Sequence, residues 1–201
     1  MQIAPIPDLP ELWVLRHGET EWNVAERLQG RLDSPLTPKG VAQAQQQGDI
    51  LRAAALPAEA RLICSPSGRA LHTARIVAGA LDRDLCTDPA LLEINLGAWQ
   101  GCYLADIPEA RAAAQGGFDP HMWKFSGPGC ESVDQMSARL GDFLVALTGP
   151  TVIVTHGVTS RMLRCLATGR APDALSQLPG GQGVVHHVAK GVARTLPQER
   201  V

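Results

Sequence analysis

Side chains that bind anions occur at the predicted carboxyl ends of separate strands in this sequence. They are Arg16, His17, Arg69 and His156. A guanidinium group donates forked hydrogen bonds that match the oxygens of a phosphate or a carboxylate. Histidine has an unperturbed pKa near 6.5, so it offers a neutral imidazole at neutral pH. We expect these four residues to form an anion-binding site if the fold brings them together.

Arg69 is predicted to lie on the first turn of a helix, where its charge opposes the positive end of the helix dipole. Such a position is slightly unfavourable unless an anion lies between the guanidinium group and the helix end. The mismatch therefore indicates an anion beside Arg69.

The segments around these residues alternate between predicted strands and predicted helices. Short apolar runs predict buried strands over residues 11–17, 60–65 and 151–156. Apolar residues at helical spacing predict helices that begin after Thr37, Pro66 and Ser132, and a further helix over residues 157–167. The tail of residues 183–196 alternates weakly around a Lys-Gly turn, which predicts a hairpin at the edge of a sheet.

Strands joined by helices require crossover connections, and this requirement sets the expected fold class. We expect an α/β protein, a three-layer α/β/α sandwich with a mainly parallel sheet and an antiparallel edge strand. Polar residues at the carboxyl ends of the strands collect in one crevice of such a sheet. Arg16, His17, Arg69 and His156 would then share one site.

Length and composition limit the class of protein. The 201 residues, 45% hydrophobic and 19% charged, predict a single domain over 1–201, with a core of about 11–196 and a loop or insert region of about 102–130. Part of that region, residues 110–118, is interpreted as a mobile insertion. The net charge of −2 argues against a strongly basic nucleic-acid-binding protein, and no apolar run is long enough to span a membrane. The five cysteines form no CxxC pair, which predicts reduced thiols, no metal site and a cytoplasmic location.

Several segments resemble, in order and spacing, the motifs of the histidine phosphatase superfamily, the phosphoglycerate-mutase-like group. They are LRHGETEWN (15–23), LQGRLDSPLTPKG (28–40), SPSGRALHTA (65–74), LLEINLGAWQG (91–101), GPGCES (127–132) and VTHG (154–157). The resemblance extends from about residue 11 to about residue 168. It implies in-line phosphoryl transfer to a histidine on a phosphoglycerate-mutase-like fold.

The resemblance also implies roles for individual residues. His17 is similar to the nucleophile that becomes phosphohistidine, and Arg16, Arg69 and His156 are similar to the cradle around the phosphoryl oxygens. Such a cradle stabilises the transferred group without a metal or a cofactor. Glu93 corresponds to the general acid that protonates the leaving oxygen and then activates water. The residues that correspond to the lining of the substrate pocket are Asn23, Gln29, Gly30 and Gly157.

Departures from the mutase pattern favour a phosphatase. Mutases of this group resemble RHYG where this chain has INLG (94–97), and they carry Asn where this chain has Val158. They are also longer, with an inserted segment and a tail that shields the phosphoenzyme from water. We therefore expect a phosphomonoesterase acting on a sugar phosphate, a phosphoglycerate, or a nucleotide-pathway or cobalamin-precursor phosphate. A phosphoglycerate mutase and a catalytically silent phospho-ligand binding protein are the alternatives.

The expected partner is thus a small-molecule phosphomonoester, with neither a nucleic acid nor a membrane, and a homodimer is left open. Asp33 is expected to shape the turn into the helix after Thr37. Arg161 and Arg164 are expected to lie on solvated helix faces or to hold loops. The candidate walls of the pocket within residues 102–130 are His121, Trp123, Lys124 and Phe125.

Overall fold

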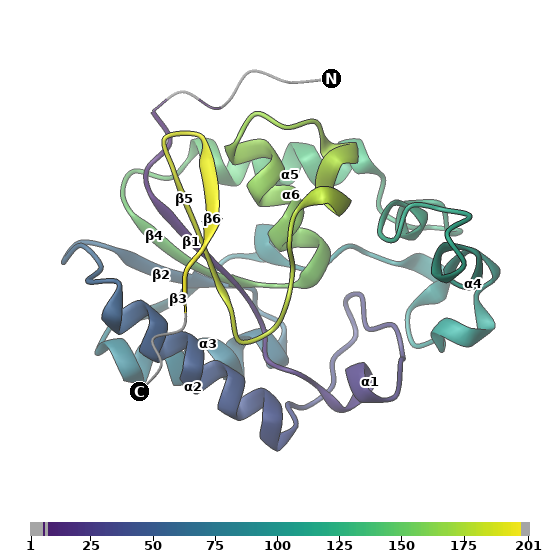
Figure 1. The fold of residues 1–201 in the computed structure, drawn as a ribbon, viewed down its shortest axis with the longest axis horizontal. Coiled ribbons are helices and arrows are strands. Elements are labelled where there is room, and N and C mark those ends of the chain that lie inside the picture. Colours follow the sequence, from purple (N-terminus) through teal and green to yellow (C-terminus); the bar gives the residue numbers. More distant parts are fainter. Residues whose placement is uncertain (1–5, 7, 198–201) are drawn as a thin grey trace.

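The computed structural model describes residue 6 and residues 8–197, and within these residues the chain forms a six-stranded sheet. The strands are β1 Leu12–Arg16, β2 Arg61–Cys64, β3 Leu85–Thr87, β4 Thr151–Thr155, β5 Val185–Ala189 and β6 Val192–Thr195. Their order across the sheet is β3-β2-β4-β1-β5-β6 (Figure 1). The first four are parallel, whereas β5 and β6 pair antiparallel as a terminal hairpin. The predicted α/β class and the predicted edge hairpin are confirmed, and β3 is a short strand that the apolar pattern did not predict.

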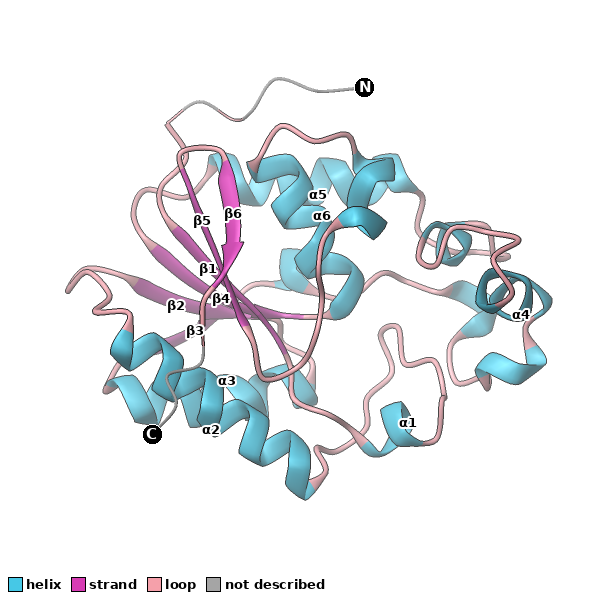
Figure 2. Ribbon diagram, in the orientation of Figure 1, coloured by secondary structure: helices cyan, strands magenta, loops and turns pink. Residues whose placement is uncertain are grey.

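Helices cover both faces of the sheet and produce the expected three layers (Figure 2). Helices α2 and α3 lie on one face, and α5 and α6 lie on the other. The α-helix bounds are α1 Glu21–Val24, α2 Pro38–Ala53, α3 Gly68–Leu81, α4 Pro108–Ala114, α5 Val133–Val145 and α6 Gly157–Ala167. None of the helices in the described residues has both the length and the apolar character that crossing a membrane requires.

The side chains of β1 show why the strand sequences are uninterrupted runs of apolar residues. Trp13 and Leu15 pack toward α2 and α3, whereas Leu12 and Val14 pack toward α5 and α6. All four side chains are buried. A strand covered on both faces needs apolar residues at every position, so its pattern is continuous and not alternating.

Two helices begin at the capping residues that the sequence predicts. Thr37 Oγ1 accepts a hydrogen bond from the backbone N–H of Gly40 at 3.0 Å at the start of α2. Ser132 and Gln135 form a reciprocal capping box at the start of α5. Each cap satisfies donors that a helix leaves unpaired at its first turn.

The insert region of residues 102–130 is folded against the rest of the chain. It contains α4 and two short 3-10 helices, η3 (Leu104–Asp106) and η4 (Met122–Phe125). Ile107 and Trp123 are buried in the same apolar cluster as α5 and α6. Of residues 110–118, interpreted from the sequence as a mobile insertion, the first half belongs to helix α4, which ends at Ala114. Pro108 at the start of this helix and the alanines after it favour that conformation.

Candidate active site

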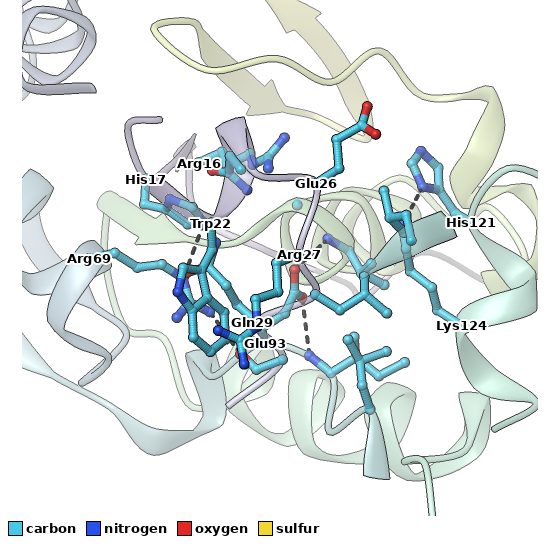
Figure 3. A pocket seen from close by; sticks show the side chains of 18 of the residues that line it. Arg16, His17, Trp22, Glu26, Arg27, Gln29, Arg69, Glu93, His121 and Lys124 are labelled. Carbon is cyan, nitrogen blue, oxygen red and sulfur yellow. Dashed lines mark hydrogen bonds between the residues drawn. The ribbon is translucent and has the colours of Figure 1, made fainter. Parts of the chain in front are cut away.

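The residues predicted to bind an anion meet at the carboxyl ends of the parallel strands, around a cavity of about 300 Å³ (Figure 3). The predicted site residues in its lining are Arg16, His17, Asn23, Gln29, Gly30, Arg69, Glu93 and Gly157. His156 lies directly behind this lining, because it is fully buried and its ring centroid is 5.3 Å from that of His17. The crossover topology therefore assembles the predicted set from segments that are far apart in the chain.

His17 follows β1 and is held in one tautomer. Its Nδ1 lies 2.7 Å from the carbonyl oxygen of Gly18, so Nδ1 carries the proton and the lone pair is on Nε2. Nε2 lies 3.3 Å from Nε of Arg69. Burial lowers the pKa of His17 well below its usual value, and the charges of Arg16, His156 and Arg69 lower it further. The residue is thus a neutral imidazole whose basic nitrogen faces the arginine.

Arg69 is held by the protein itself on several sides. Its Nη1 donates to the carbonyl of Leu32 at 2.6 Å and pairs with Asp33 Oδ1 at 3.0 Å, and its Nη2 donates to the carbonyl of Gly30 at 2.8 Å. Asp33 Oδ1 also accepts from the backbone N–H of Arg69 at 3.1 Å, at the first turn of α3. These contacts bear on two expectations, of which the first is contradicted and the second is met. Asp33 anchors α3 instead of shaping the turn before α2, and Asp33 supplies the anion that the helix position of Arg69 indicated.

Two buried nitrogens of the site have no hydrogen-bond partner among the described residues: Arg16 Nε and His156 Nδ1. His156 Nε2 lies 2.7 Å from the Ser65 hydroxyl, which can donate to it and leave the ring proton on Nδ1. Burial lowers the pKa of His156 well below its usual value, and Arg69 and Arg16 add to this effect. An unpaired buried donor costs about 1–3 kcal/mol. A bound anion would satisfy both nitrogens.

Glu93 lies in the loop after the 3-10 helix η1 (Pro89–Leu91), where it caps the N-terminus of α6. Its Oε2 accepts the backbone N–H of Val158 at 3.1 Å. Its Oε1 accepts the N–H of Thr159 at 3.0 Å and that of Ile94 at 3.1 Å, and it lies 2.9 Å from the Thr159 hydroxyl. Burial acts to raise the pKa of Glu93, but these hydrogen bonds outweigh it and the pKa lies below its ordinary value. The free site therefore holds Glu93 as a carboxylate.

The polar residues predicted for the pocket lining lie in the segment between β1 and α2. Gln29 Nε2 lies 2.8 Å from Thr20 Oγ1, and Gln29 Oε1 is buried without a partner among the described residues. Asn23 Oδ1 accepts from Gln182 Nε2 at 3.0 Å, so a loop distant in sequence holds it in place. Gly30 has a φ of 53°, a left-handed conformation that glycine adopts without strain.

Two arginines that were not predicted to belong to the site, Arg27 and Arg161, also line the cavity. The guanidinium group of Arg27 lies 3.9 Å from the ring centroid of Trp22, which also lines the cavity. Arg161 donates from Nη1 to the carbonyl of Gly157 at 3.0 Å, one helical turn back along α6. That spacing from Gly157 is a signal that could have placed Arg161 in the site.

The structure also locates the remaining candidate residues of the pocket wall and of α6. His121 and Lys124 line the cavity as expected, whereas Trp123 is buried in the apolar cluster beside them. Arg164 is fully buried and donates to the carbonyl of Pro179 at 2.7 Å, which confirms a loop-holding role and not a solvated face. Thr159, which contacts Glu93, carries no local signal beyond its place near the start of α6.

This arrangement can bind a tetrahedral dianion, because N–H donors from three parts of the fold converge on one space. A neutral imidazole lies beside them as a nucleophile, and a carboxylate lies in the same cavity to exchange protons. Among the described residues, no group of three or more His, Cys, Asp or Glu side chains is placed to hold a metal ion.

Comparison with known proteins assigns the chain to one family. The family model of the histidine phosphatase superfamily (branch 1) matches residues 12–190. A probable phosphoglycerate mutase GpmB from an Enterobacter species is 33% identical over 168 residues, which cover 79% of this chain and 73% of that protein. A second GpmB, from Proteus mirabilis, is 47% identical over a shorter stretch of 97 residues, which spans 48% of this chain and 44% of that protein.

A solved structure supports the same grouping. The mycobacterial glucosyl-3-phosphoglycerate phosphatase, determined with VO3, is 30% identical and superimposes with a TM-score of 0.73. The match covers 90% of this chain and 91% of that one. The similarity therefore extends over most of the length of this chain.

Proposed function

The chain belongs to the histidine phosphatase superfamily and is a phosphatase of that group, and we propose that it hydrolyses the phosphomonoester of a small metabolite through a phosphohistidine at His17. The observation that carries the proposal is the state of His17. Its Nδ1 donates to Gly18, so the lone pair lies on Nε2, where it accepts a hydrogen bond from Arg69 Nε in the free site, and burial keeps the ring neutral. A neutral, oriented imidazole among arginines suits attack on a phosphate dianion.

In the first step, His17 Nε2 attacks the phosphorus atom, and the bond between phosphorus and the ester oxygen breaks. Arg16, Arg69 and the Nδ1–H of His156 stabilise the charge on the other three phosphoryl oxygens. Glu93 gives its proton to the leaving oxygen, so a neutral alcohol departs.

The low pKa of Glu93 in the free site means that its carboxylate must take up a proton when the substrate binds, either from solvent or from the monoanionic form of the phosphate. A phosphate dianion in the cradle repels the Glu93 carboxylate, and a nearby like charge raises the pKa of a carboxyl group. Substrate binding thus favours the protonated form that the first step needs. After Glu93 has donated its proton, the hydrogen bonds from α6 stabilise the carboxylate form.

In the second step, a water molecule takes the place of the alcohol beside Glu93. The carboxylate removes a proton from this water while its oxygen attacks the phosphorus atom. The bond between phosphorus and His17 Nε2 breaks, inorganic phosphate leaves, and the free imidazole is restored. One carboxyl group serves both steps because the alcohol and the water occupy the same place.

The His17→Ala variant tests this mechanism. It should lose both turnover and an acid-labile phosphoenzyme, measured by phosphate release and by acid-quenched labelling with a radioactive substrate. The matched control is His72→Ala, because His72 is exposed on the outer side of α3. Retention of either the turnover or the label in His17→Ala would show that the nucleophile lies elsewhere.

Hydrolysis of p-nitrophenyl phosphate separates an enzyme from a silent binding protein. We expect turnover that persists in excess chelator, because the cradle is built from arginine and imidazole donors and a metal has no step assigned to it. Binding of inorganic phosphate without turnover would favour the silent protein.

A phosphoglycerate mutase is the second candidate, and the names of the curated relatives favour it. Product analysis after incubation with 3-phosphoglycerate distinguishes the two. Release of inorganic phosphate indicates a hydrolase, whereas formation of 2-phosphoglycerate with little free phosphate would contradict the proposal. A panel of phosphorylated metabolites assayed for phosphate release would then identify the substrate.

A further inference from the structure

The end of the active-site cavity away from His17 carries cations with no carboxylate beside them. Figure 3 shows Lys124 and His121 on the opposite side of the cavity from His17, with Glu93 between the two sides. Arg161 of α6 lines the same cavity. In the part of the chain that the structure describes, no carboxylate oxygen lies within 4.0 Å of a side-chain nitrogen of Lys124 or Arg161.

The partner of the Lys124 ammonium is an uncharged ring. Lys124 Nζ lies 3.2 Å from Nδ1 of His121, three residues earlier in the chain. Burial lowers the pKa of His121 to about 3, so this ring is neutral and accepts the hydrogen bond. Burial also lowers the pKa of Lys124 to about 8, and the negative charge of Glu93 only partly opposes this shift. A desolvated ammonium without an anion beside it is unfavourable.

Three carboxylates lie near this end of the cavity: Glu26, Glu93 and Asp119. Among the described residues Glu26 forms no ion pair with Lys124 or Arg161, and the other two are engaged elsewhere. Asp119 Oδ1 accepts the backbone N–H groups of His121 and Met122, each at 2.9 Å, and also contacts the Ser176 hydroxyl. These bonds hold the turn that carries His121 and Lys124, so Asp119 positions the cluster without neutralising it. Glu93 accepts its hydrogen bonds from the first turn of α6 and from Ile94.

The cations around the cavity are spread over both of its ends. Its described lining contains five cationic side chains, Arg16, Arg27, Arg69, Lys124 and Arg161, against the two carboxylates Glu26 and Glu93. Asp33 already pairs with Arg69, and a phosphoryl dianion on the His17 side lies next to Arg16 and Arg69, so neither of these anions lies beside Lys124. In the proposed mechanism the leaving oxygen lies at Glu93, so the rest of the leaving alcohol extends toward Lys124.

We propose that Lys124, with Arg161 and His121, forms a subsite for a second anionic group on the leaving alcohol. The inference rests on the proposed function and narrows it. The substrate is then a phosphomonoester whose alcohol also carries a carboxylate or a second phosphate, and the subsite selects it over a neutral alcohol of the same size. Arg161 links the two ends of the cavity, because it lies one turn along α6 from Gly157 of the phosphate side.

Three substrates of equal chain length test the subsite: propyl phosphate, its analogue with a carboxylate at the far carbon, and propanediol bisphosphate. The native enzyme should prefer at least one of the two charged compounds over propyl phosphate by about tenfold or more in kcat/KM, the scale of one hydrogen-bonded charge. Which of the two it prefers identifies the second group as carboxylate or phosphate. In Lys124→Met this preference should fall to about twofold or less.

Two further variants separate loss of charge from loss of folding. Lys124→Arg keeps the positive charge and should keep most of the preference. Arg111→Met removes an exposed cation of α4, in the same insert region but outside the lining of the cavity, and should leave the preference unchanged.

Several results would overturn the subsite. Equal kcat/KM for the three compounds in the native enzyme would do so, as would a preference that survives in Lys124→Met. Turnover of p-nitrophenyl phosphate accompanied by either result would leave the proposed function intact and remove the subsite alone. Lack of turnover on p-nitrophenyl phosphate would overturn the proposed function, and the subsite with it.

Discussion

Replacement of Glu93 by Gln tests the proton-transfer role most directly, because the side-chain shape is kept and only the proton chemistry is removed. The structure sets the orientation of the new amide. An amide oxygen at the place of Oε1 keeps the bonds from Thr159 and Ile94, and the amide nitrogen then faces the N–H of Val158. The N–H of Val158 then loses its acceptor and faces another donor, and each buried donor left unpaired should cost about 1–3 kcal/mol of stability.

The kinetic effect should depend on the leaving group. An alkyl phosphate needs a proton on its leaving oxygen, so Glu93→Gln should slow it by about 10²–10⁴-fold, the usual contribution of general acid–base catalysis. The leaving group of p-nitrophenyl phosphate needs little protonation, so formation of the phosphoenzyme should be nearly normal. Its hydrolysis still needs the base, and the phosphoenzyme should accumulate.

Rapid-mixing kinetics provide the assay. We expect Glu93→Gln to release a burst of about one p-nitrophenol per active site, followed by slow turnover, and to show no burst with the alkyl phosphate. The matched control is Glu131→Gln, since Glu131 is a buried carboxylate that pairs with Arg139 outside the cavity lining. It should lower stability without creating a burst. An equal loss of rate on both substrates, with no burst, would refute the assignment of Glu93.

Other changes test the surroundings of the site. Arg69→Lys should reduce kcat/KM by about 10²-fold or more, because an ammonium cannot replace the forked donors, and near-native rates would contradict the cradle assignment. Gly18→Ala should destabilise the protein by about 1–3 kcal/mol in urea denaturation, because a Cβ there would overlap the backbone of Gly40, whereas Gly79→Ala in open space on α3 should not. The folded-state pKa of His186 is about 3 because of burial, below the unfolded value near 6.5, so the unfolded chain takes up the proton first as the pH falls. The native protein should therefore lose about 2 kcal/mol more than His186→Gln between pH 7.5 and 5.0, and equal losses would show that this ring is not the cause.

Much of the fold followed from local patterns in the sequence. The apolar run around Val14 predicted a strand covered on both faces, and the caps at Thr37 and Ser132 predicted where α2 and α5 begin. These features depend on neighbouring residues, so the sequence expresses them directly. The short strand β3 and helix α4 were missed because their few residues carry too little pattern to stand out.

The candidate site also has features that the sequence predicted and features that it did not. The residue types and their places at strand ends were sufficient to group Arg16, His17, Arg69 and His156, and the motif around Glu93 added the carboxyl group. Their chemical states depend on contacts that are distant in sequence. The neighbour of Arg69 is Asp33, and the pKa of Glu93 is lowered by donors at the start of α6, neither of which the local sequence indicates.

The sequence by itself thus determined the kind of chemistry, because nucleophile, cations and acid are properties of residue types and of the strand ends that carry them. Only the tertiary structure decided which groups are neutral, which are charged and which lack a partner. Burial and long-range hydrogen bonds keep His17 uncharged, hold Glu93 as a carboxylate and leave Lys124 beside a neutral ring. These are effects of solvent exclusion and three-dimensional contact, and they arise only when segments far apart in the chain pack around one cavity.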